Sequence, residues 1–152
     1  MVKPSIHNLP INDTGFLLWR LSNIWRKQIN DAIGHLELTH VQYLLLASIA
    51  QLEYKEKLTS QKSIAQYARI DIMMTSKVLR KLELRKLVKR KKYHMDGRVY
   101  LSTLTKKGQE LLGDATPIIK KVDRSFFESV TQNKFSLQSI FSETIEDQYH
   151  MN

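Results

Sequence analysis

The chain has 152 residues, of which 42% are hydrophobic and 26% are charged, a size and composition typical of one folded domain and not of a disordered segment. It contains no cysteine, which excludes disulfide bonds, thiolate metal sites and thiol chemistry. The net charge is +9, and residues 55–107 hold sixteen Lys and Arg against four acidic residues, which predicts a polyanionic partner; the alternative is a basic face that serves only solubility.

Residues 1–12 contain two of the three prolines and show no periodicity, so we expect an extended arm. This arm has no apolar run that would serve as a signal sequence. The chain also lacks the roughly 18 to 20 consecutive apolar residues of a membrane span. We therefore expect a soluble, cytoplasmic protein with no membrane partner.

Apolar residues then recur at spacings of three and four, which predicts a helix over 13–34 that Gly34 ends. The apolar positions are Leu17, Leu18, Leu21, Ile24, Trp25, Ile29, Ala32 and Ile33. Thr39 and Gln42 have the spacing of a capping box, so a second helix should begin there and run to about Leu52.

Two further helices follow within a short stretch. Ser60 is placed to cap a short helix that reaches Ala68, and Asp71 is placed to cap a strongly basic helix. Only residues 69–71 separate the two. This arrangement is a helix-turn-helix, and a DNA major groove is wide enough to admit its second helix.

The hydrophobic pattern then changes from a helical to an alternating period. Residues 87–93 and 99–104 read as two strands, and residues 94–98 between them are rich in the residues that turns favour. A hairpin that follows a helix-turn-helix makes a winged helix.

Two helices complete the chain. Thr105 should cap a helix that runs to about Ser129 with a kink at Pro117, and Thr131 should cap the last helix. The apolar residues in this part are too many for a lone helix surface and predict contact with a second copy of the chain; the alternative is a monomer that packs them internally. These residues are Phe126, Phe127, Phe135, Ile140, Phe141 and Ile145.

Four short motifs occur in register along the chain. They are Ser60-Gln61-Lys62-Ser63-Ile64-Ala65, Leu82-Glu83, Asp96-Gly97-Arg98 and Leu104-Thr105-Lys106-Lys107-Gly108. Together they resemble the MarR (multiple antibiotic resistance regulator) family of winged-helix transcription regulators. One departure is Lys86, where the family commonly has Gly; a left-handed Lys86 would cost roughly 1 kcal/mol.

The resemblance implies a mainly α fold with a small β-hairpin wing. A winged helix-turn-helix over 38–104 would form the DNA-binding lobe. The N- and C-terminal helices, over 13–34 and 105–149, would be dimerisation helices. All three parts would belong to a single domain over 1–152.

The second helix of the helix-turn-helix is expected to read bases. Side chains three and four apart share a face, which groups Met73, Ser76, Lys77 and Arg80. Lys77 and Arg80 are candidates to contact a phosphate or a guanine, and Ser76 is a candidate to contact DNA through its hydroxyl. Met73 or Met74 suits the thymine methyl, although core packing explains the two methionines equally well. The predicted DNA-binding residues of this lobe, before the wing, are Ser60, Gln61, Met73, Met74, Thr75, Ser76, Lys77 and Arg80.

In the wing, the resemblance implies that Arg98 enters or borders the minor groove. Asp96 would hold the hairpin by pairing with the Arg98 guanidinium. The alternative is an ion pair that only holds the fold. Lys92 and His94, with the basic residues 89–91, would lie along the DNA backbone and add affinity without sequence choice.

Relatives in this family bind small aromatic acids between the dimer helices and the DNA-binding lobe. Trp19, Trp25, His35, Tyr43 and Tyr67 are candidates to line such a cleft, although core packing explains them at least as well. The five histidines form no cluster at ligand spacing, so we expect no metal and no cofactor. The chain has no Gly-rich phosphate loop and no nucleophile elbow, and we do not expect an enzyme.

The sequence therefore predicts a homodimeric transcription regulator that binds double-stranded DNA at a pseudo-palindromic operator. We expect a repressor, released by a small aromatic or phenolic effector. The alternatives are a non-specific architectural DNA-binding protein and a dimeric sensor or scaffold for a protein partner.

Overall fold

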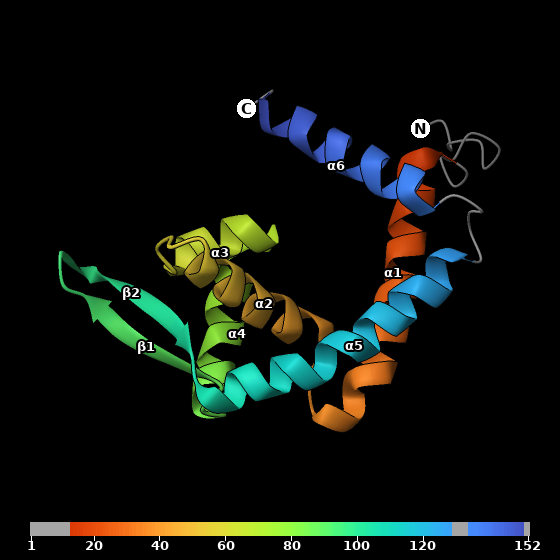
Figure 1. Ribbon diagram of the computed structural model, residues 1–152. Coiled ribbons are helices and arrows are strands. Elements are labelled where there is room, and N and C mark those ends of the chain that lie inside the picture. The colour runs from red at the N-terminus through yellow and green to blue at the C-terminus, as the bar shows by residue number, and fades with distance from the viewer. Residues whose placement is uncertain (1–12, 129–133, 151–152) are drawn as a thin grey trace, which may run out of the picture.

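The computed structural model describes residues 13–128 and 134–150, so the predicted arm and the predicted Thr131 cap lie outside the described residues. In chain order the elements are α1 (Thr14–Ile33), the 3-10 turn η2 (Gly34–Leu36), α2 (His40–Tyr54), α3 (Gln61–Ala68), α4 (Ile72–Leu84), β1 (Val88–Tyr93), β2 (Asp96–Leu104), α5 (Lys106–Glu128) and α6 (Lys134–His150). The β-hairpin stands at one end of the molecule, and α1 and α5 pack together at the other (Figure 1). This mainly α winged-helix fold confirms the predicted fold class.

Side-chain caps set the predicted helix starts. Thr39 Oγ1 accepts from the Gln42 amide at 3.3 Å, and the Gln42 carboxamide oxygen accepts from the Thr39 amide at 3.0 Å, which is the predicted capping box. Asp71 Oδ1 accepts from the amides of Met73 and Met74, both at 2.9 Å. Because a helix leaves its first-turn amides unbonded, these local partners decide where it begins.

Three helix ends show how the chain turns. Gly34 follows α1 as predicted, but its φ is −58°, and the left-handed conformation falls at Glu37, with φ 52°. Arg69 ends α3 with φ 53°. Lys86 also takes the left-handed conformation, with φ 60°, at the position where the family commonly has Gly. Its side chain therefore carries a local cost of roughly 1 kcal/mol relative to glycine.

The hairpin turn is tighter than predicted. β1 and β2 pair antiparallel, and the register shifts after Lys92, so that Tyr93 lies opposite Asp96. Only residues 94–95 are left for the turn, and the predicted turn over 94–98 was too long. The additional residues of β2 interrupt the regular pairing of the two strands near the hairpin tip.

The base of the hairpin is tied to the start of α3. The Ser102 amide donates to the Thr59 carbonyl at 3.0 Å, and Ser60 forms an isolated bridge with Leu101. Ser102 and Thr59 are both buried. The sequence pattern did not predict this tie, which holds the hairpin against the helix-turn-helix.

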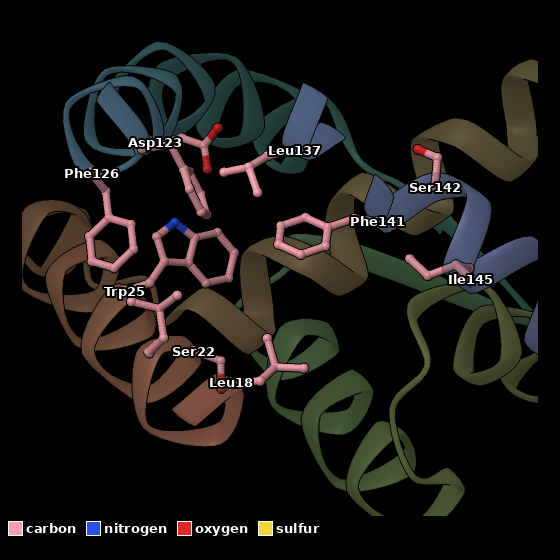
Figure 2. A pocket seen from close by; sticks show the side chains of 11 residues that line it. Leu18, Ser22, Trp25, Asp123, Phe126, Leu137, Phe141, Ser142 and Ile145 are labelled. Atoms are coloured by element: carbon pink, nitrogen blue, oxygen red, sulfur yellow. The ribbon is translucent and has the colours of Figure 1, made fainter. Parts of the chain in front are cut away.

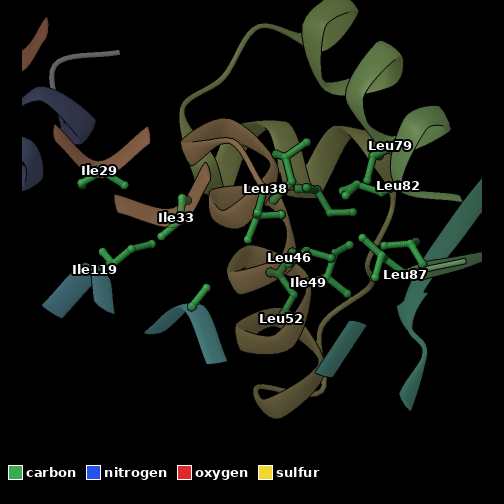
Figure 3. Packing of buried hydrophobic residues seen from close by; sticks show 14 residues of the cluster. Ile29, Ile33, Leu38, Leu46, Ile49, Leu52, Leu79, Leu82, Leu87 and Ile119 are labelled. Atoms are coloured by element: carbon green, nitrogen blue, oxygen red, sulfur yellow. The ribbon is translucent and has the colours of Figure 1, made fainter. Parts of the chain in front are cut away.

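One cluster of buried aliphatic side chains connects the winged helix to α1 and α5 (Figure 3). At one end of it lie Ile29, Ile33 and Ile119, and at the other lie Leu79 and Leu87, with α2 between them. The buried members are Ile29, Ile33, Leu38, Leu45, Leu46, Ile49, Leu52, Ile64, Leu79, Leu82, Leu87, Val88, Ala115 and Ile119. Because this core is continuous, the orientation of the winged helix depends on packing against both terminal helices.

The first half of α1 is less buried than its apolar pattern suggested. Leu17, Leu18 and Ile24 are 46%, 54% and 52% exposed, whereas Ile29 and Ile33 are fully buried. The apolar stripe therefore continues beyond the core onto the surface. Within residues 13–128 and 134–150, no helix is long and apolar enough to cross a membrane.

The wing and α5 meet at a close backbone contact. Thr105 Oγ1 donates to the Lys86 carbonyl at 2.7 Å and accepts from the Gly108 amide at 3.1 Å. The Thr105 amide donates to the Leu87 carbonyl at 3.1 Å. A Cβ added at Gly108 would lie 2.1 Å from the Leu87 carbonyl oxygen, so only glycine allows α5 to approach the strand this closely.

We expect Gly108→Ala to lower the free energy of unfolding by about 1 to 3 kcal/mol, because the added methyl must push α5 away from backbone atoms. Gly113→Ala is the matched control in the same helix, since a Cβ there has nothing within 4 Å. This control should raise stability by roughly 0.5 to 1 kcal/mol. Urea unfolding measures both, and shifts of the same sign and size would contradict the proposed contact.

Candidate nucleic-acid interface

Ten exposed basic residues lie on or directly beside α3, α4 and the hairpin. They are Lys62, Arg69, Lys77, Arg80, Lys81, Lys86, Lys89, Lys91, Lys92 and Arg98. Only residues 85–87 separate α4 from β1, and Figure 1 shows the hairpin projecting away from the helices. The charge of this region is therefore carried by adjoining elements that a long polyanion can contact together.

α4 buries one face and exposes the other. Met73 and Met74 are 75% and 52% exposed, Lys77 and Arg80 are exposed, and Ser76 is half-buried. The structure thus brings the predicted reading face together on one helix. It also removes the alternative of core packing for the two methionines.

The prediction for Thr75 was wrong. Its side chain is fully buried, and its hydroxyl donates to the Asp71 carbonyl at 2.9 Å. Thr75 shares the core side of α4 with Leu79 and Leu82, which are also fully buried. The spacing 75, 79, 82 follows the helical period, and this pattern would have assigned Thr75 to the core.

The start of α3 offers less free polar surface than predicted. Ser60 and Gln61 are half-buried. Ser60 Oγ accepts from the Ser63 amide at 3.1 Å and lies 2.9 Å from Ser63 Oγ. The Ser60 hydroxyl is therefore engaged as a helix cap, and DNA would meet it only as an additional partner.

The wing holds Arg98 through its backbone. Asp96 Oδ1 accepts from the Arg98 amide at 2.9 Å, so the predicted pairing with the Arg98 guanidinium was wrong. An Asp side chain readily bonds the amide two residues ahead, which makes a local turn and leaves the following side chain free to point elsewhere. Arg98 itself is exposed, near the start of β2.

Arg90 behaves differently from the lysines of β1. Its side chain is 15% exposed and lies 3.7 Å from Glu83 Oε2, and its guanidinium lies 5.4 Å from the centroid of the Tyr100 ring. Arg90 ties the hairpin to α4, so we no longer expect it to contact phosphates, whereas the lysines of β1 are exposed. At the tip, exposed His94 packs edge-on against Tyr93 with ring centroids 5.0 Å apart.

The five residues predicted to line an effector cleft do not come together. Trp19 is 64% exposed on α1, and His35 is exposed on η2. Tyr67 is 45% exposed on α3, where the Lys55 ammonium lies 5.8 Å from its ring centroid. These three are surface residues of separate elements, so the prediction of one shared cleft was wrong.

The remaining two, Tyr43 and Trp25, are partly buried. The Tyr43 hydroxyl lies 3.4 Å from Thr116 Oγ1, where it links α2 to α5. Trp25 lines a groove between the terminal helices. Among the described residues, no three His, Asp or Glu side chains are grouped to hold a metal ion.

The groove has a volume of about 560 Å³ and lies among α1, α5 and α6. Figure 2 shows Trp25 of α1 and Phe141 of α6 pointing toward one another across it. Its lining residues are Leu18, Leu21, Ser22, Trp25, Asp123, Phe126, Phe127, Leu137, Phe141, Ser142 and Ile145. The sequence identified the apolar stripe of α6 but not its position opposite Trp25, because that depends on tertiary packing.

Trp25 also joins α1 to α2. Its ring lies perpendicular to that of His40, with centroids 5.0 Å apart, and the His40 amide donates to Asn30 Oδ1 at 2.7 Å. Burial, and secondarily the Arg26 charge, lowers the pKa of His40, so the imidazole is neutral near pH 7. Trp25 Nε1 and His40 Nδ1 are both buried without a hydrogen-bond partner.

The chain is similar in sequence to known transcription regulators. Residues 38–100 match the sequence profile of the MarR family. The uncharacterized HTH-type transcriptional regulator YdcH of Bacillus subtilis is 34% identical over 131 residues, which cover 86% of this chain and 89% of YdcH.

Solved structures share the fold. BpsR of Bordetella bronchiseptica, whose DNA binding is regulated by 6-hydroxynicotinic acid, matches with a TM-score of 0.74 at 21% identity, over 87% of this chain and 97% of BpsR. A mutant of MarR from E. coli, complexed with operator DNA, matches with a TM-score of 0.75 at 15% identity, over 95% of this chain and 99% of that one. At these identities the likeness concerns the fold alone.

We expect Arg98→Ala to weaken binding to duplex DNA by about 1 to 3 kcal/mol, because it deletes an exposed guanidinium from an ordered wing. Asp96→Asn is the matched control, since it keeps the Oδ1 acceptor for the Arg98 amide and removes a negative charge. This control should bind equally well or more tightly. Fluorescence anisotropy titrations on one duplex compare the variants. An unchanged affinity for Arg98→Ala would show that this side chain of the wing does not contact DNA.

Proposed function

The chain belongs to the MarR family of transcription regulators, and we propose that it is a repressor that binds a pseudo-palindromic operator as a homodimer. The observation that carries this proposal is the exposed face of α4, with Met73, Lys77 and Arg80, beside the basic hairpin. In a helix-turn-helix the second helix lies in the major groove. Two such helices in a symmetric dimer would meet two half-sites related by the same symmetry.

The two basic elements would divide the work of binding. Lys89, Lys91 and Lys92 of β1 are exposed, whereas Arg90 of the same strand is held by Glu83. The three lysines would therefore contact phosphates. Phosphate contacts position a protein on DNA without reading the sequence. Lys77 and Arg80 lie on the helix that would enter the groove, where long basic side chains reach base edges.

The function is tested by replacing the two groups separately. Changing the three β1 lysines to Gln should weaken binding to operator and to random DNA by the same factor. The slope of log binding constant against log salt concentration should become shallower by roughly 0.9 for each phosphate that is no longer neutralised. Lys77→Ala and Arg80→Ala should instead each reduce the difference in binding free energy between operator and random DNA by about 1 to 3 kcal/mol. The operator is a duplex enriched by the protein from a random pool.

Lys121→Gln is the control, because this lysine is exposed on α5, outside both groups. It should leave both affinities unchanged. If both groups of variants lowered the affinities for operator and random DNA by the same factor, the result would contradict sequence-specific regulation and favour the architectural alternative.

A small aromatic or phenolic effector would bind beside Trp25. Its buried Nε1 donor has no partner, and a carboxylate or phenolic oxygen is an acceptor that it lacks. The regulation of BpsR by 6-hydroxynicotinic acid supports an effector of this class. Adding that acid to the operator titration should release the wild-type protein and not Trp25→Phe; equal release would place the effector elsewhere.

The homodimer is supported by the apolar surface of the terminal helices. Phe141 and Ile145 of α6 are 40% and 54% exposed, and Leu18 of α1 is 54% exposed. All three line the groove among α1, α5 and α6. Contiguous apolar surface of this kind is costly in water and usually marks a protein interface.

Leu18→Glu and Phe141→Glu should each weaken the dimer by at least about 2 to 3 kcal/mol, roughly 30- to 150-fold in Kd, because a charge would be buried in the interface. Tyr54→Glu is the control, since Tyr54 is 84% exposed at the end of α2, outside the terminal helices. Sedimentation equilibrium at micromolar concentration measures the mass. Variants that remain dimers as stable as the wild type would place the interface on another surface.

A further inference from the structure

The first turn of α4 exposes three consecutive apolar side chains. Ile72, Met73 and Met74 are 42%, 75% and 52% exposed. They lie on the helix that the proposed function places in the major groove, ahead of its basic residues. Other exposed apolar side chains of α3, α4 and the hairpin, such as Tyr67, Leu84 and Met95, stand singly, whereas this turn exposes three in a row, which favours an apolar partner.

This end of α4 is poorly suited to a phosphate. Helix starts commonly bind anions through their free amides. Here Asp71 Oδ1 already accepts from the amides of Met73 and Met74, both at 2.9 Å. The Asp71 carboxylate also adds a negative charge that repels a phosphate. The Thr75 hydroxyl, which would otherwise offer a donor, is turned inward to the Asp71 carbonyl.

The charges that follow on the helix favour DNA as the partner of this turn. Lys77, Arg80 and Lys81 are exposed one and two turns further along α4. A protein surface that met the apolar turn would also have to neutralise these cations, whereas DNA supplies phosphates along both sides of its groove. Among the groups that bases display in the major groove, the thymine C5-methyl is the apolar one.

We propose that the first turn of α4 reads thymine methyl groups, so that the operator carries thymine at the base pairs this turn meets. Met73 is the most exposed of the three and makes the main contact, with Ile72 and Met74 beside it. The inference rests on the proposed operator binding and specifies the chemistry by which α4 selects its site.

The test removes single methyl groups from the DNA. Full-length protein first enriches duplexes from a random pool, and each thymine of the enriched sequence is then replaced in turn by deoxyuridine, which lacks only the C5-methyl. For the wild type, affinity should fall about three- to fivefold at each thymine that α4 contacts, as expected for one buried methyl. Met73→Ala should bind the thymine and deoxyuridine duplexes equally at one or more of these positions.

Leu84→Ala is the matched control, because Leu84 is an apolar residue 83% exposed on the last turn of the same helix. It should keep the wild-type ratio of thymine to deoxyuridine affinities. Enrichment of a defined sequence to which the wild type binds equally with and without every methyl overturns the inference and leaves operator binding standing. Failure to enrich any sequence overturns both. The inference is also overturned if Met73→Ala changes the oligomeric mass but keeps the wild-type ratio of thymine to deoxyuridine affinities, because the turn would then contact protein and not DNA.

Discussion

The arrangement of the molecule depends on the contact between the first turn of α5 and the chain between α4 and β1. There the Thr105 hydroxyl links the Lys86 carbonyl to the Gly108 amide, and Gly108 lets α5 lie against the Leu87 carbonyl. The left-handed Lys86 turns the chain from α4 into the hairpin at the same point. α4, the wing and α5 therefore meet within a few residues, and α5 cannot shift without displacing the other two.

Other contacts make the winged helix a stiff unit around that point. Ser102 bonds Thr59 at the base of the hairpin, and Arg90 packs between Glu83 and Tyr100. Both hold the wing in a constant relation to the helices beside it. A movement of α1 and α5 would thus displace α4 and the wing together as one rigid body.

The parts of the fold that follow from neighbours in the chain were predictable. The caps at Thr39 and Asp71 depend on amides within the next turn, and the residues that form them are recognisable by spacing alone. The exposed face of α4 followed from the helical period, and the same period would have placed Thr75 on the buried face. The burial of Arg90 was not predictable in this way, because it requires Glu83 and Tyr100 from two other elements. The residues predicted to line one cleft lie on separate elements, because the local pattern of a single sequence does not show which helix faces meet.

The two tryptophans of this chain differ in solvent exposure, so their fluorescence can be used to follow the structure. Trp19 is 64% exposed, whereas the indole of Trp25 lies edge-on to the buried imidazole of His40 at the joint of α1 and α2. Emission from Trp19 should therefore resemble that of an indole in water, whereas emission from the partly buried Trp25 should lie at shorter wavelength. A protonated imidazole quenches a neighbouring indole, and the lowered pKa of His40 delays that quenching to more acidic solution than an ordinary histidine would require. The fluorescence of the unmodified protein thus reports whether the two helices remain joined.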